Sequence, residues 1–386
     1  MNDQQVVIIG GGPAGLACAA ELRRVGVPSV VLERGDTVGY SWRGRHDRLR
    51  LNTSRWFSHF TGTQYPKGTG VFPTRDDMIR YLEDYTERNQ VAVRLHTRVA
   101  RVDRVERGWV VHTSSGEIAA RQVIVATGLC GAPAIPDWPG RDRYGGQLLH
   151  AGEYRNTAGF RDDADVLVVG PGSSGMEIAY DLAMGGARRV RLSVRTPPNI
   201  LLRSLGGLPG DPLAMVFLAM PPRVADAQIR AMRRLTIGDL SAYGLPAPVE
   251  GPFSRLHRLG TAPAIVDKEV LQAVKARRIE IVASVDSLDE TGAALADGTR
   301  AGVGVIIAAT GYRTGLEPLV GHLDVLDRRG LPRVSGAGEA APGLRFAGYS
   351  AQPGLISYIG REAKRTARTI ASVADTARPG QSRPGQ

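Results

Sequence analysis

The stretch Val6-Val7-Ile8-Ile9-Gly10-Gly11-Gly12-Pro13-Ala14-Gly15 decides the fold of the first part of this chain. The aliphatic run is short, continuous and β-branched, and it predicts a buried strand. The residues after the glycines, 14–23, show the pattern of a helix. In such a turn Gly10 permits the tight bend, Gly12 lets a pyrophosphate approach, and Gly15 lets the helix pack near the strand. The free N–H groups at the helix start attract phosphate.

A second predicted strand, Ser29-Val30-Val31-Leu32, leads into Glu33 and Arg34. Glu33 lies 18 residues after Gly15, where a carboxylate accepts hydrogen bonds from a ribose 2′-OH. A glycine-rich turn in an unrelated α/β protein is the alternative, but strand, turn, helix, strand and acid all stand in register. The dinucleotide contacts that we expect here are Gly10, Gly12, Pro13, Ala14, Gly15, Glu33 and Arg34.

The same pattern recurs later in the chain. The strand Val166-Leu167-Val168-Val169 precedes the turn Gly170-Pro171-Gly172-Ser173-Ser174-Gly175, and the next predicted strand, 189–194, ends at Arg195. An acid at that place favours an unphosphorylated ribose, whereas an arginine favours a 2′-phosphate. We therefore predict FAD at the first site and NADPH at the second. The expected NADPH contacts are Gly170, Gly172, Ser173, Ser174, Gly175 and Arg195; weaker candidates for the phosphate are Arg191 and Arg203, and the alternative for Arg195 is a solvated surface side chain.

Composition limits the other functions that this chain could have. The 386 residues carry a net charge of +11, but the positive side chains are scattered, so we expect no nucleic-acid partner. The two cysteines, Cys18 and Cys130, form no C-x-x-C pair, which argues against a disulfide-relay flavoprotein. The seven histidines show no metal-ligand spacing, so we expect no metal site.

The sequence contains no apparent targeting or membrane signal. Met1 leads almost directly into the first predicted strand, and the apolar stretch 212–222 holds only 11 residues. We therefore expect no signal peptide, no stable membrane insertion and a cytoplasmic location. The sequence leaves a homodimer possible.

These patterns predict an α/β fold with two Rossmann-like dinucleotide-binding domains. The expected FAD-binding domain is discontinuous and comprises residues 1–155 and 306–376, with the NADPH-binding domain, 160–305, inserted in it. A helix is predicted to start at Thr74, with Asp77 completing a capping box, and segments 91–95, 99–105 and 109–113 predict a small β-meander. The Pro- and Gly-rich end, 377–386, predicts a disordered tail.

Several motifs resemble the class B flavoprotein monooxygenases, in particular the YUCCA-like and flavin-containing branches. The segment 144–154 resembles the family fingerprint F-x-G-x-x-x-H-x-x-x-W, with tyrosine at both aromatic ends. The other matching segments are Gly39-Tyr40-Ser41-Trp42, Phe72-Pro73-Thr74-Arg75, 170–182, Ala309-Thr310-Gly311-Tyr312 and 344–370. The resemblance covers nearly all of the chain up to about residue 373.

The resemblance implies further site residues. The fingerprint implies a domain-coupling motif of Tyr144, Gly146, His150 and Tyr154. Further cofactor contacts are expected at Trp42, Ala126, Thr127, Gly128, Ala309, Thr310, Gly311, Gln352 and Leu355. Asn52 matches the asparagine of the x-N-x-S-K segment of flavin-containing monooxygenases and is the catalytic candidate. The alternatives are an ordinary turn asparagine for Asn52 and a core side chain for Trp42.

The resemblance implies an NADPH-dependent flavin monooxygenase that inserts one atom of O2 into a small organic substrate through a C4a-(hydro)peroxyflavin. The reaction is either N- or S-oxygenation or oxidative decarboxylation of a 2-oxo acid such as indole-3-pyruvate. The alternatives are a Baeyer–Villiger monooxygenase, an NAD(P)H oxidase or flavin reductase without oxygen transfer, and a nucleotide-sensing flavoprotein. Residues 200–265 are where we expect substrate specificity to be decided.

Overall fold

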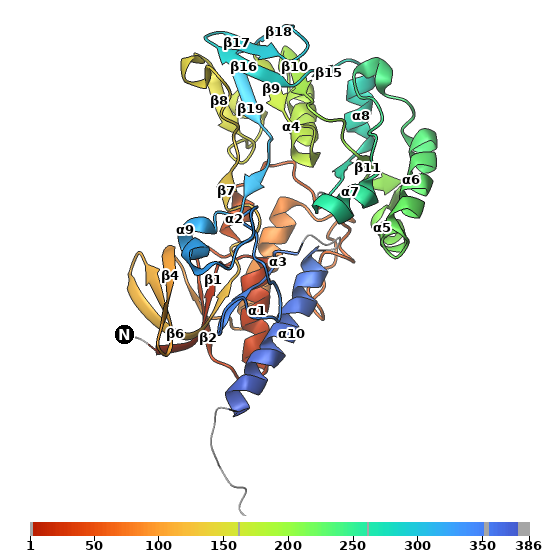
Figure 1. Cartoon of the computed structure of the whole chain (residues 1–386). Helices are drawn as coiled ribbons and strands as arrows, with labels where there is room; N and C mark the ends of the chain where they lie inside the picture. The colour runs from red at the N-terminus through yellow and green to blue at the C-terminus, as the bar shows by residue number, and fades with distance from the viewer. Residues whose placement is uncertain (1–2, 161–162, 261, 351–354, 377–386) are drawn as a thin grey trace, which may run out of the picture.

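The computed structural model describes residues 3–160, 163–260, 262–350 and 355–376. It has two lobes, each built on its own β-sheet (Figure 1). The first and the last described segments of the chain belong to the first lobe, and the second lobe is formed by the middle of the chain. The two Rossmann-like domains, with one inserted in the other, are thus confirmed. The predicted tail, 377–386, lies outside the described residues.

The first lobe holds a seven-stranded sheet in the order β3-β2-β1-β6-β5-β4, with β21 paired to β6. Its strands are β1 (Asp3–Ile9), β2 (Ser29–Leu32), β3 (Val93–Arg94), β4 (Val99–Val105), β5 (Gly108–Thr113), β6 (Gly116–Val125) and β21 (Leu344–Phe346). Strands β1, β2, β3 and β21 run parallel to the end of β6. Strand β5 pairs antiparallel with β6, and β4 pairs antiparallel with β5 at the edge of the sheet. The β-meander therefore consists of β4, β5 and the start of β6. The prediction that 91–95 opens the meander was wrong, because β3 pairs parallel with β2 and extends the nucleotide-binding sheet.

Three helices cover one face of this sheet: α1 (Pro13–Arg24), α3 (Arg75–Arg88) and α10 (Leu355–Thr376). Their apolar residues, among them Leu16, Tyr81 and Ile370, share one core cluster with the strand residues Val6 and Ile8. The predicted capping box is confirmed. The Asp77 backbone N–H donates to the Thr74 hydroxyl at 3.1 Å, and the Thr74 N–H donates to the Asp77 carboxylate at 2.9 Å. On the other face lies α9 (Glu317–Val320).

The second lobe holds a five-stranded parallel sheet in the order β15-β10-β9-β19-β8. The strands are β8 (Gln147–His150), β9 (Asp165–Val169), β10 (Arg189–Ser193), β15 (Ile279–Val282) and β19 (Val305–Ala308). Helices α4 (Ser173–Met184) and α8 (Lys268–Lys275) pack on one face, and the antiparallel strands β16 (Val285–Asp289), β17 (Gly292–Leu295) and β18 (Arg300–Gly302) pack on the other.

The expected boundary of the second domain differs from the hydrogen-bonding pattern at two strands. The sequence placed β8 and most of β19 with the first domain, but β19 pairs with β9 on one side and with β8 on the other. Ile306 and Ile307 are fully buried in this sheet. The second sheet therefore extends from residue 147 to residue 308.

A helical insert follows the second nucleotide-binding unit. It contains α5 (Asp211–Leu218), α6 (Pro222–Thr236) and α7 (Pro252–Leu259), whose residues Phe217, Ile229 and Phe253 form a separate apolar cluster. Parallel strands β11 (Ile200–Leu202) and β14 (Ala264–Val266) join it to the lobe, and the hairpin β12 (Ser204–Leu205) and β13 (Leu208–Pro209) precedes α5. We call residues 200–266 the insert; its helices lie beside α8 in Figure 1.

The chain crosses between the lobes at two strands that pair with each other. β7 (Ala132–Pro133) leads out of the first lobe and β20 (Tyr312–Arg313) leads back, and the two are antiparallel. The short helix α2 (Tyr40–Arg43) lies near this crossing (Figure 1). Within the part of the chain that the structure describes, no helix has the length and apolar character needed to cross a bilayer.

Candidate cofactor and active site

The first glycine turn is built around two crowded glycines and one open glycine. Gly10 has a φ of +112°, and a Cβ there would lie 2.7 Å from the Ala126 carbonyl oxygen. A Cβ on Gly15 would lie 1.9 Å from the Gly10 oxygen, but a Cβ on Gly12 would meet nothing within 4 Å. Gly12 also directly precedes α1 as its N-cap residue, and no side chain caps this helix end. The open space beside uncapped N–H groups fits a pyrophosphate.

The carboxylate of Glu33 is buried against this turn. The Gly11 N–H donates to its Oε2 at 2.7 Å, and the Gly35 N–H donates to its Oε1 at 2.9 Å. A carboxylate oxygen has room for a further hydrogen bond, so these contacts leave Glu33 able to accept from a ribose hydroxyl. The sequence predicted the ribose contact but not this bracing of the turn. Arg34 is exposed, and Pro13 and Ala14 form the first turn of α1.

The second glycine turn repeats the geometry of the first. Gly170 has a φ of +113°, and a Cβ there would lie 2.5 Å from the Ala309 carbonyl oxygen. A Cβ on Gly175 would lie 1.9 Å from the Gly170 oxygen, while Gly172 again faces open space. We call each glycine turn, together with the helix start that follows it, a cradle. The second cradle fits a second dinucleotide for the same reason as the first. The two following serines differ, because the Ser173 hydroxyl accepts from the Ile265 N–H at 2.9 Å whereas Ser174 is exposed.

The three arginines proposed for a 2′-phosphate have different environments. Arg195 follows β10 by two residues, is exposed and has no hydrogen bond or ion pair with any described residue. Arg191 is buried and donates to the Gly302 carbonyl at 3.3 Å. Arg203 is buried between two carboxylates, those of Glu177 and Asp267. Of these three side chains, Arg195 is therefore the one available to an added phosphate.

The ends of two central strands meet at the crossing between the lobes. Ala126, Thr127 and Gly128 follow β6, and the Thr127 hydroxyl lies 2.8 Å from that of Tyr349. Ala309, Thr310 and Gly311 follow β19 in the second lobe, and the Thr310 hydroxyl donates to the Ala134 carbonyl at 2.6 Å. Each segment therefore begins beside the glycine turn of its own lobe and continues into the crossing.

The predicted coupling motif is a set of contacts around this crossing. His150 is fully buried; its Nδ1 accepts from the Gly152 N–H at 3.0 Å, and its Nε2 donates to the Gly311 carbonyl at 2.9 Å. These partners define a neutral imidazole, and burial lowers the pKa of His150 below its usual value. The Tyr154 hydroxyl donates to Asp181 of α4 at 2.7 Å. His150 therefore holds a strand end in place, and these contacts assign it no proton transfer.

The start of the motif is also fixed by packing. The Tyr144 hydroxyl donates to the Val303 carbonyl at 2.9 Å. A Cβ on Gly146 would lie 2.5 Å from the Gly304 oxygen and 2.4 Å from the Tyr144 hydroxyl. Only glycine fits this position without a shift of the backbone, which explains the glycine of the motif.

A segment of the first lobe that the sequence did not single out as a unit makes a series of contacts with the second lobe. We call residues 43–55 the strap. Arg45 donates to the Tyr312 hydroxyl at 2.6 Å, Arg48 lies 3.5 Å from Asp181, and the Ser54 N–H and hydroxyl both donate to Asp211 of the insert. The ring of Tyr312 in turn meets His150 edge-on, with 4.6 Å between ring centroids. The strap therefore connects the first lobe to β20, α4 and α5 together.

One strap contact joins two titratable groups. His46 Nε2 lies 3.6 Å from a carboxylate oxygen of Glu177, which also pairs with Arg203. His46 is buried, and neither ring nitrogen has a hydrogen-bond partner among the described residues. Burial lowers the pKa of His46 to about 4, and burial raises the pKa of Glu177 to about 7 despite the opposing charge of Arg203.

The remaining candidates have few specific contacts that would indicate a role. Asn52 lies in the strap, is exposed and makes no hydrogen bond with a described residue. Trp42 of α2 is half-buried and packs against the core of the first lobe, as does Leu355 at the start of α10. Gln352 lies outside the described residues. The catalytic role of Asn52 and the individual cofactor contacts therefore stay predictions.

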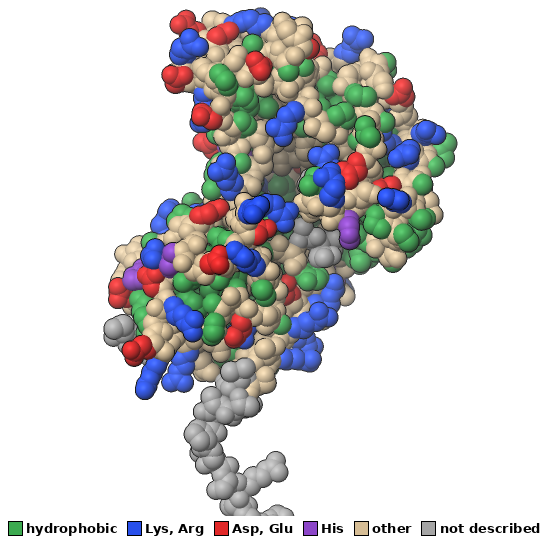
Figure 2. All heavy atoms as spheres, in the orientation of Figure 1, with side chains coloured by type: hydrophobic (Ala, Val, Ile, Leu, Met, Phe, Trp, Pro, Cys, Tyr) green, Lys and Arg blue, Asp and Glu red, His purple; other side chains and the backbone are tan. Residues whose placement is uncertain are grey.

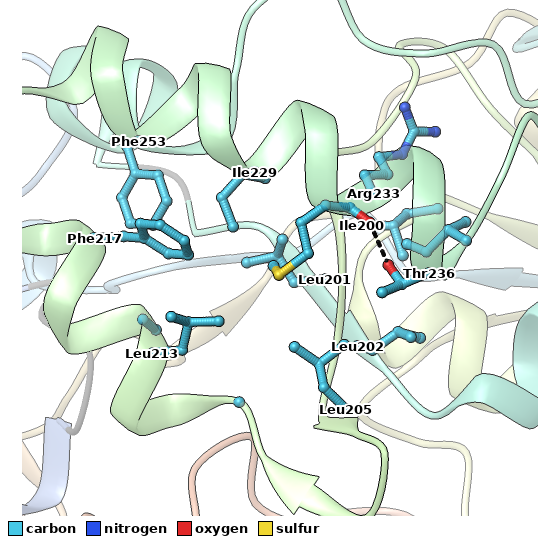
Figure 3. Close-up of a pocket in the computed structure, with 14 residues that line it drawn as sticks. Ile200, Leu201, Leu202, Leu205, Leu213, Phe217, Ile229, Arg233, Thr236 and Phe253 are labelled. Atoms are coloured by element: carbon cyan, nitrogen blue, oxygen red, sulfur yellow. Dashed lines mark hydrogen bonds between the residues drawn. The ribbon is translucent and has the colours of Figure 1, made fainter.

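The surface recess between the lobes and an apolar pocket in the insert differ in the size of ligand that they could hold. Figure 2 shows that the surface is recessed between the lobes, with Lys and Arg side chains around the recess. A separate apolar pocket lies in the insert, where Phe217 and Phe253 face each other at one end and Thr236 closes the other (Figure 3). The cavity volume of about 40 Å³ in the insert accommodates only water-sized molecules, so the recess between the lobes is the better candidate for the reaction site.

Comparison with known proteins supports this assignment. The family model of the pyridine nucleotide-disulphide oxidoreductases matches residues 7–200. Indole-3-pyruvate monooxygenase YUCCA1 of Oryza sativa subsp. japonica is 34% identical over 334 residues, which are 85% of this chain and 82% of that protein. Indole-3-pyruvate monooxygenase YUCCA8 of Oryza sativa subsp. indica is 34% identical over 384 residues, 95% of this chain and 90% of that protein.

A solved structure has a similar overall fold. A mutant of a flavin monooxygenase from Stenotrophomonas maltophilia superposes with a TM-score of 0.75 at 25% identity, and the match covers 97% of this chain and 100% of the other. The whole architecture, including the second lobe and the insert region, is thus comparable with that of a known oxygen-transferring flavoprotein.

Proposed function

The chain belongs to the YUCCA family of flavin monooxygenases, and we propose that it catalyses the oxidative decarboxylation of an aryl 2-oxo acid such as indole-3-pyruvate. Its cofactors are FAD and NADPH. The proposed reaction consumes one 2-oxo acid, one O2, one NADPH and one proton. It yields the carboxylic acid shortened by one carbon, CO2, NADP⁺ and water.

The observation that carries this proposal is the pair of matching dinucleotide cradles on one chain. Each has an open glycine at an uncapped helix start, Gly12 in the first and Gly172 in the second. The strand ends beneath them, Ala126 and Ala309, both lead into the crossing between the lobes. This arrangement suits two cofactors that must meet at one point.

When bound, the flavin accepts hydride from NADPH and activates O2 for transfer of one oxygen atom to the substrate. The protein's own residues supply the remaining requirements. His150 fixes the Gly311 carbonyl and so sets the direction of the returning crossing strand. Arg45 fixes Tyr312 against it. These contacts hold the two cradles in one relative orientation, which proximity-based catalysis requires.

The preference for an acidic substrate rests on the recess between the lobes as well as on the relatives. Lys and Arg side chains, with some Asp and Glu among them, lie around the recess (Figure 2), and the chain carries a net charge of +11. Net positive charge raises the local concentration of an anion at a concave site. A 2-oxo acid carries one carboxylate at neutral pH, whereas a thioether or a cyclic ketone carries none. Charge therefore favours the 2-oxo acid over soft N or S substrates and over Baeyer–Villiger ketones.

The test is a product analysis with the FAD-loaded protein, NADPH and isotopically heavy O2. With indole-3-pyruvate we expect indole-3-acetate that contains one heavy oxygen atom, together with one CO2 per product molecule. Phenylpyruvate, a thioether and a cyclic ketone provide the comparison, each assayed for its oxygenated product by mass spectrometry.

The outcomes separate the candidate activities. Oxygen transfer to the thioether or the ketone alone would replace the proposed reaction by heteroatom oxygenation or Baeyer–Villiger oxidation. Recovery of all reducing equivalents as hydrogen peroxide, with every substrate, would leave an NAD(P)H oxidase or flavin reductase.

A further inference from the structure

A buried aspartate of the insert bonds to the first lobe rather than to its own helix. Asp211 is the first residue of α5 and is 9% exposed. Its Oδ2 accepts from the Ser54 N–H at 2.9 Å and from the Ser54 hydroxyl at 2.6 Å. Ser54 is fully buried and lies 157 residues earlier in the chain. The link therefore joins the insert directly to the strap.

This link is the main compensation for the Asp211 carboxylate. Its second oxygen, Oδ1, is buried and has no hydrogen-bond donor among the described residues. Gly210 precedes α5, and no side chain caps this helix start. A carboxylate in the first turn of a helix is favoured by the partial positive charge of that helix end, but a buried carboxylate with few hydrogen-bond partners is costly. The side chain is thus committed to holding Ser54.

Ser54 belongs to a turn that is fixed at several points. The Thr53 and Ser58 hydroxyls lie 2.6 Å apart, and the Ser58 hydroxyl also reaches the Thr53 carbonyl. The Ser357 hydroxyl of α10 lies 2.9 Å from the carbonyl oxygens of both Phe57 and His59. Helix α10 therefore holds the turn from the first lobe, and Asp211 holds it from the insert. Asn52 lies two residues before the serine that Asp211 binds.

We propose that Asp211 is a positioning residue that fixes the 52–58 turn against the insert and thereby controls water exclusion from the reaction site. This role rests on the proposed monooxygenase function. We expect Asp211 to determine which share of the electrons of NADPH ends in oxygenated product and which share ends in hydrogen peroxide. Water exclusion protects reactive intermediates, so a loosened turn increases the share of peroxide. Hydride transfer depends on the two glycine cradles and on their orientation, which the His150–Gly311 and Arg45–Tyr312 contacts fix. Asp211 takes part in neither contact, so the rate of flavin reduction stays unchanged.

The test compares Asp211→Ala with Asp226→Ala. Asp226 is a buried aspartate of the same insert and also accepts two hydrogen bonds, from the Phe253 N–H at 2.8 Å and the Ser254 N–H at 3.1 Å. Its partners lie within the insert, whereas those of Asp211 lie in the first lobe. Both variants lose a buried carboxylate, but only Asp211→Ala loses the link to the turn.

For Asp211→Ala we expect the peroxide formed per NADPH to rise by about threefold or more, because both hydrogen bonds from Ser54 to the carboxylate are lost. The rate of flavin reduction under anaerobic conditions should change by less than about twofold. Asp226→Ala should lower the unfolding midpoint without raising the peroxide share. An equal rise of peroxide in both variants would overturn the proposal, because general weakening of the insert would then explain it.

A second readout is independent of catalysis. The Ser54 amide proton donates directly to Asp211, so hydrogen exchange at this amide reports the link whether or not oxygen is transferred. We expect exchange at Ser54 to become about tenfold faster in Asp211→Ala, the effect of losing one hydrogen bond, and to stay unchanged in Asp226→Ala. Unchanged exchange in Asp211→Ala would overturn the proposal.

Ser54→Ala completes a double-mutant cycle. It removes the hydroxyl donor but keeps the backbone N–H, so it should raise the peroxide share less than Asp211→Ala does. The double variant should match Asp211→Ala alone, since the two residues share one link; additive effects would count against the proposal. If the unmodified protein transfers no oxygen, the proposed function fails, and faster exchange at Ser54 still supports Asp211 as the residue that holds the turn.

Discussion

The two dinucleotide cradles have nearly the same backbone geometry, but the side chains after the second strand of each unit carry opposite charges. In both, one glycine lies against a strand-end carbonyl, one packs against that glycine, and one faces open space. Glu33 then turns inward and accepts from the N–H groups of its own turn. Arg195 turns outward and bonds to no described residue. The backbone geometry is that of a dinucleotide site, and we expect the side chain after the second strand to decide which ribose each site accepts.

This difference also affects how far each cradle is formed before its ligand binds. The acidic side chain of the first cradle is part of the folded turn before any ligand arrives. If Arg195 binds the 2′-phosphate as predicted, it would gain its first partner from the ligand. The first cradle is therefore the more preorganised of the two, which suits a cofactor that stays bound, whereas the second suits one that exchanges in each turnover.

The largest effect is expected when a substitution blocks one cradle and leaves the other intact. Gly12→Val introduces a side chain into the space that the first pyrophosphate needs, and no protein atom opposes it, so the variant should fold but lose FAD. Gly172→Val is the matched change in the second cradle and should keep FAD while losing the response to NADPH. Absorbance of the purified proteins measures flavin content. A yellow Gly12→Val protein would remove this turn from the FAD site.

A smaller effect separates the two nicotinamide cofactors. Arg195→Ala removes a charged contact to the 2′-phosphate, and a charge-assisted hydrogen bond contributes roughly 1.5–3 kcal/mol, about 10- to 150-fold in KM for NADPH. The KM for NADH should stay nearly unchanged. Arg188→Ala is the control, because Arg188 is exposed and pairs with Asp165 away from the strand end. Equal losses for both cofactors would exclude Arg195 from the phosphate site.

A several-fold effect is expected from the catalytic candidate, Asn52. If Asn52 contacts the reacting flavin, Asn52→Ala should raise hydrogen peroxide per NADPH by about threefold or more, through the loss of one hydrogen bond near the reacting atoms. Asn89→Ala is the control, since Asn89 ends α3 and bonds to Arg24 at 3.1 Å. A peroxide share equal to that of the unmodified protein would make Asn52 an ordinary turn residue.

The smallest effect concerns the contact between the two domains. His46, with an ordinary pKa of 6.5 lowered to about 4, loses its stabilising contribution as the pH falls from 6.5 to 4. Glu177, with an ordinary pKa of 4.5 raised to about 7, loses its contribution as the pH rises from 4.5 to 7. The two dependences oppose each other between pH 4.5 and 6.5, so the unmodified protein should show a flat unfolding midpoint there.

Single variants should expose the two opposing dependences. In His46→Asn the midpoint should fall as the pH rises from 4.5 to 7, and in Glu177→Gln it should fall as the pH drops from 6.5 to 4. Each change should be a few degrees, since about 1 kcal/mol shifts the midpoint of a 150–250-residue domain by about 2–4 °C. Replacement of the exposed His257 by Asn should change neither slope. Parallel slopes in the two variants would show that the pair does not titrate in opposite directions.

The fold could be predicted wherever the decisive contacts are close in sequence. The first glycine turn, α1 and the Thr74 capping box involve residues only a few positions apart, and all are present as expected. The misassigned segment 91–95 shows the limit of this reasoning. A two-residue strand such as β3 has too little pattern to show whether it pairs parallel or antiparallel, and its pairing with β2 decides that.

The site could be predicted less completely than the fold. Both cradles and the coupling motif followed from glycine spacing and resemblance. The strap did not, because its contacts join residues as distant as Arg45 and Tyr312, 267 positions apart. No spacing rule relates such residues, and an arginine or a serine in a polar loop carries no signal of its partner. The environment that shifts the pKa of His46 and Glu177 was hidden for the same reason.

The sequence by itself determined that this chain builds two dinucleotide cradles, because a tight turn, a helix start and a strand end are local and their steric needs select particular residues. The tertiary structure alone decided how the cradles face each other. The hydrogen bonds of Asp211 and Tyr312 and the close approach of His46 to Glu177 depend on chain segments brought together by packing of the lobes. Such contacts arise from the shape of the whole molecule and so leave no local pattern in the chain.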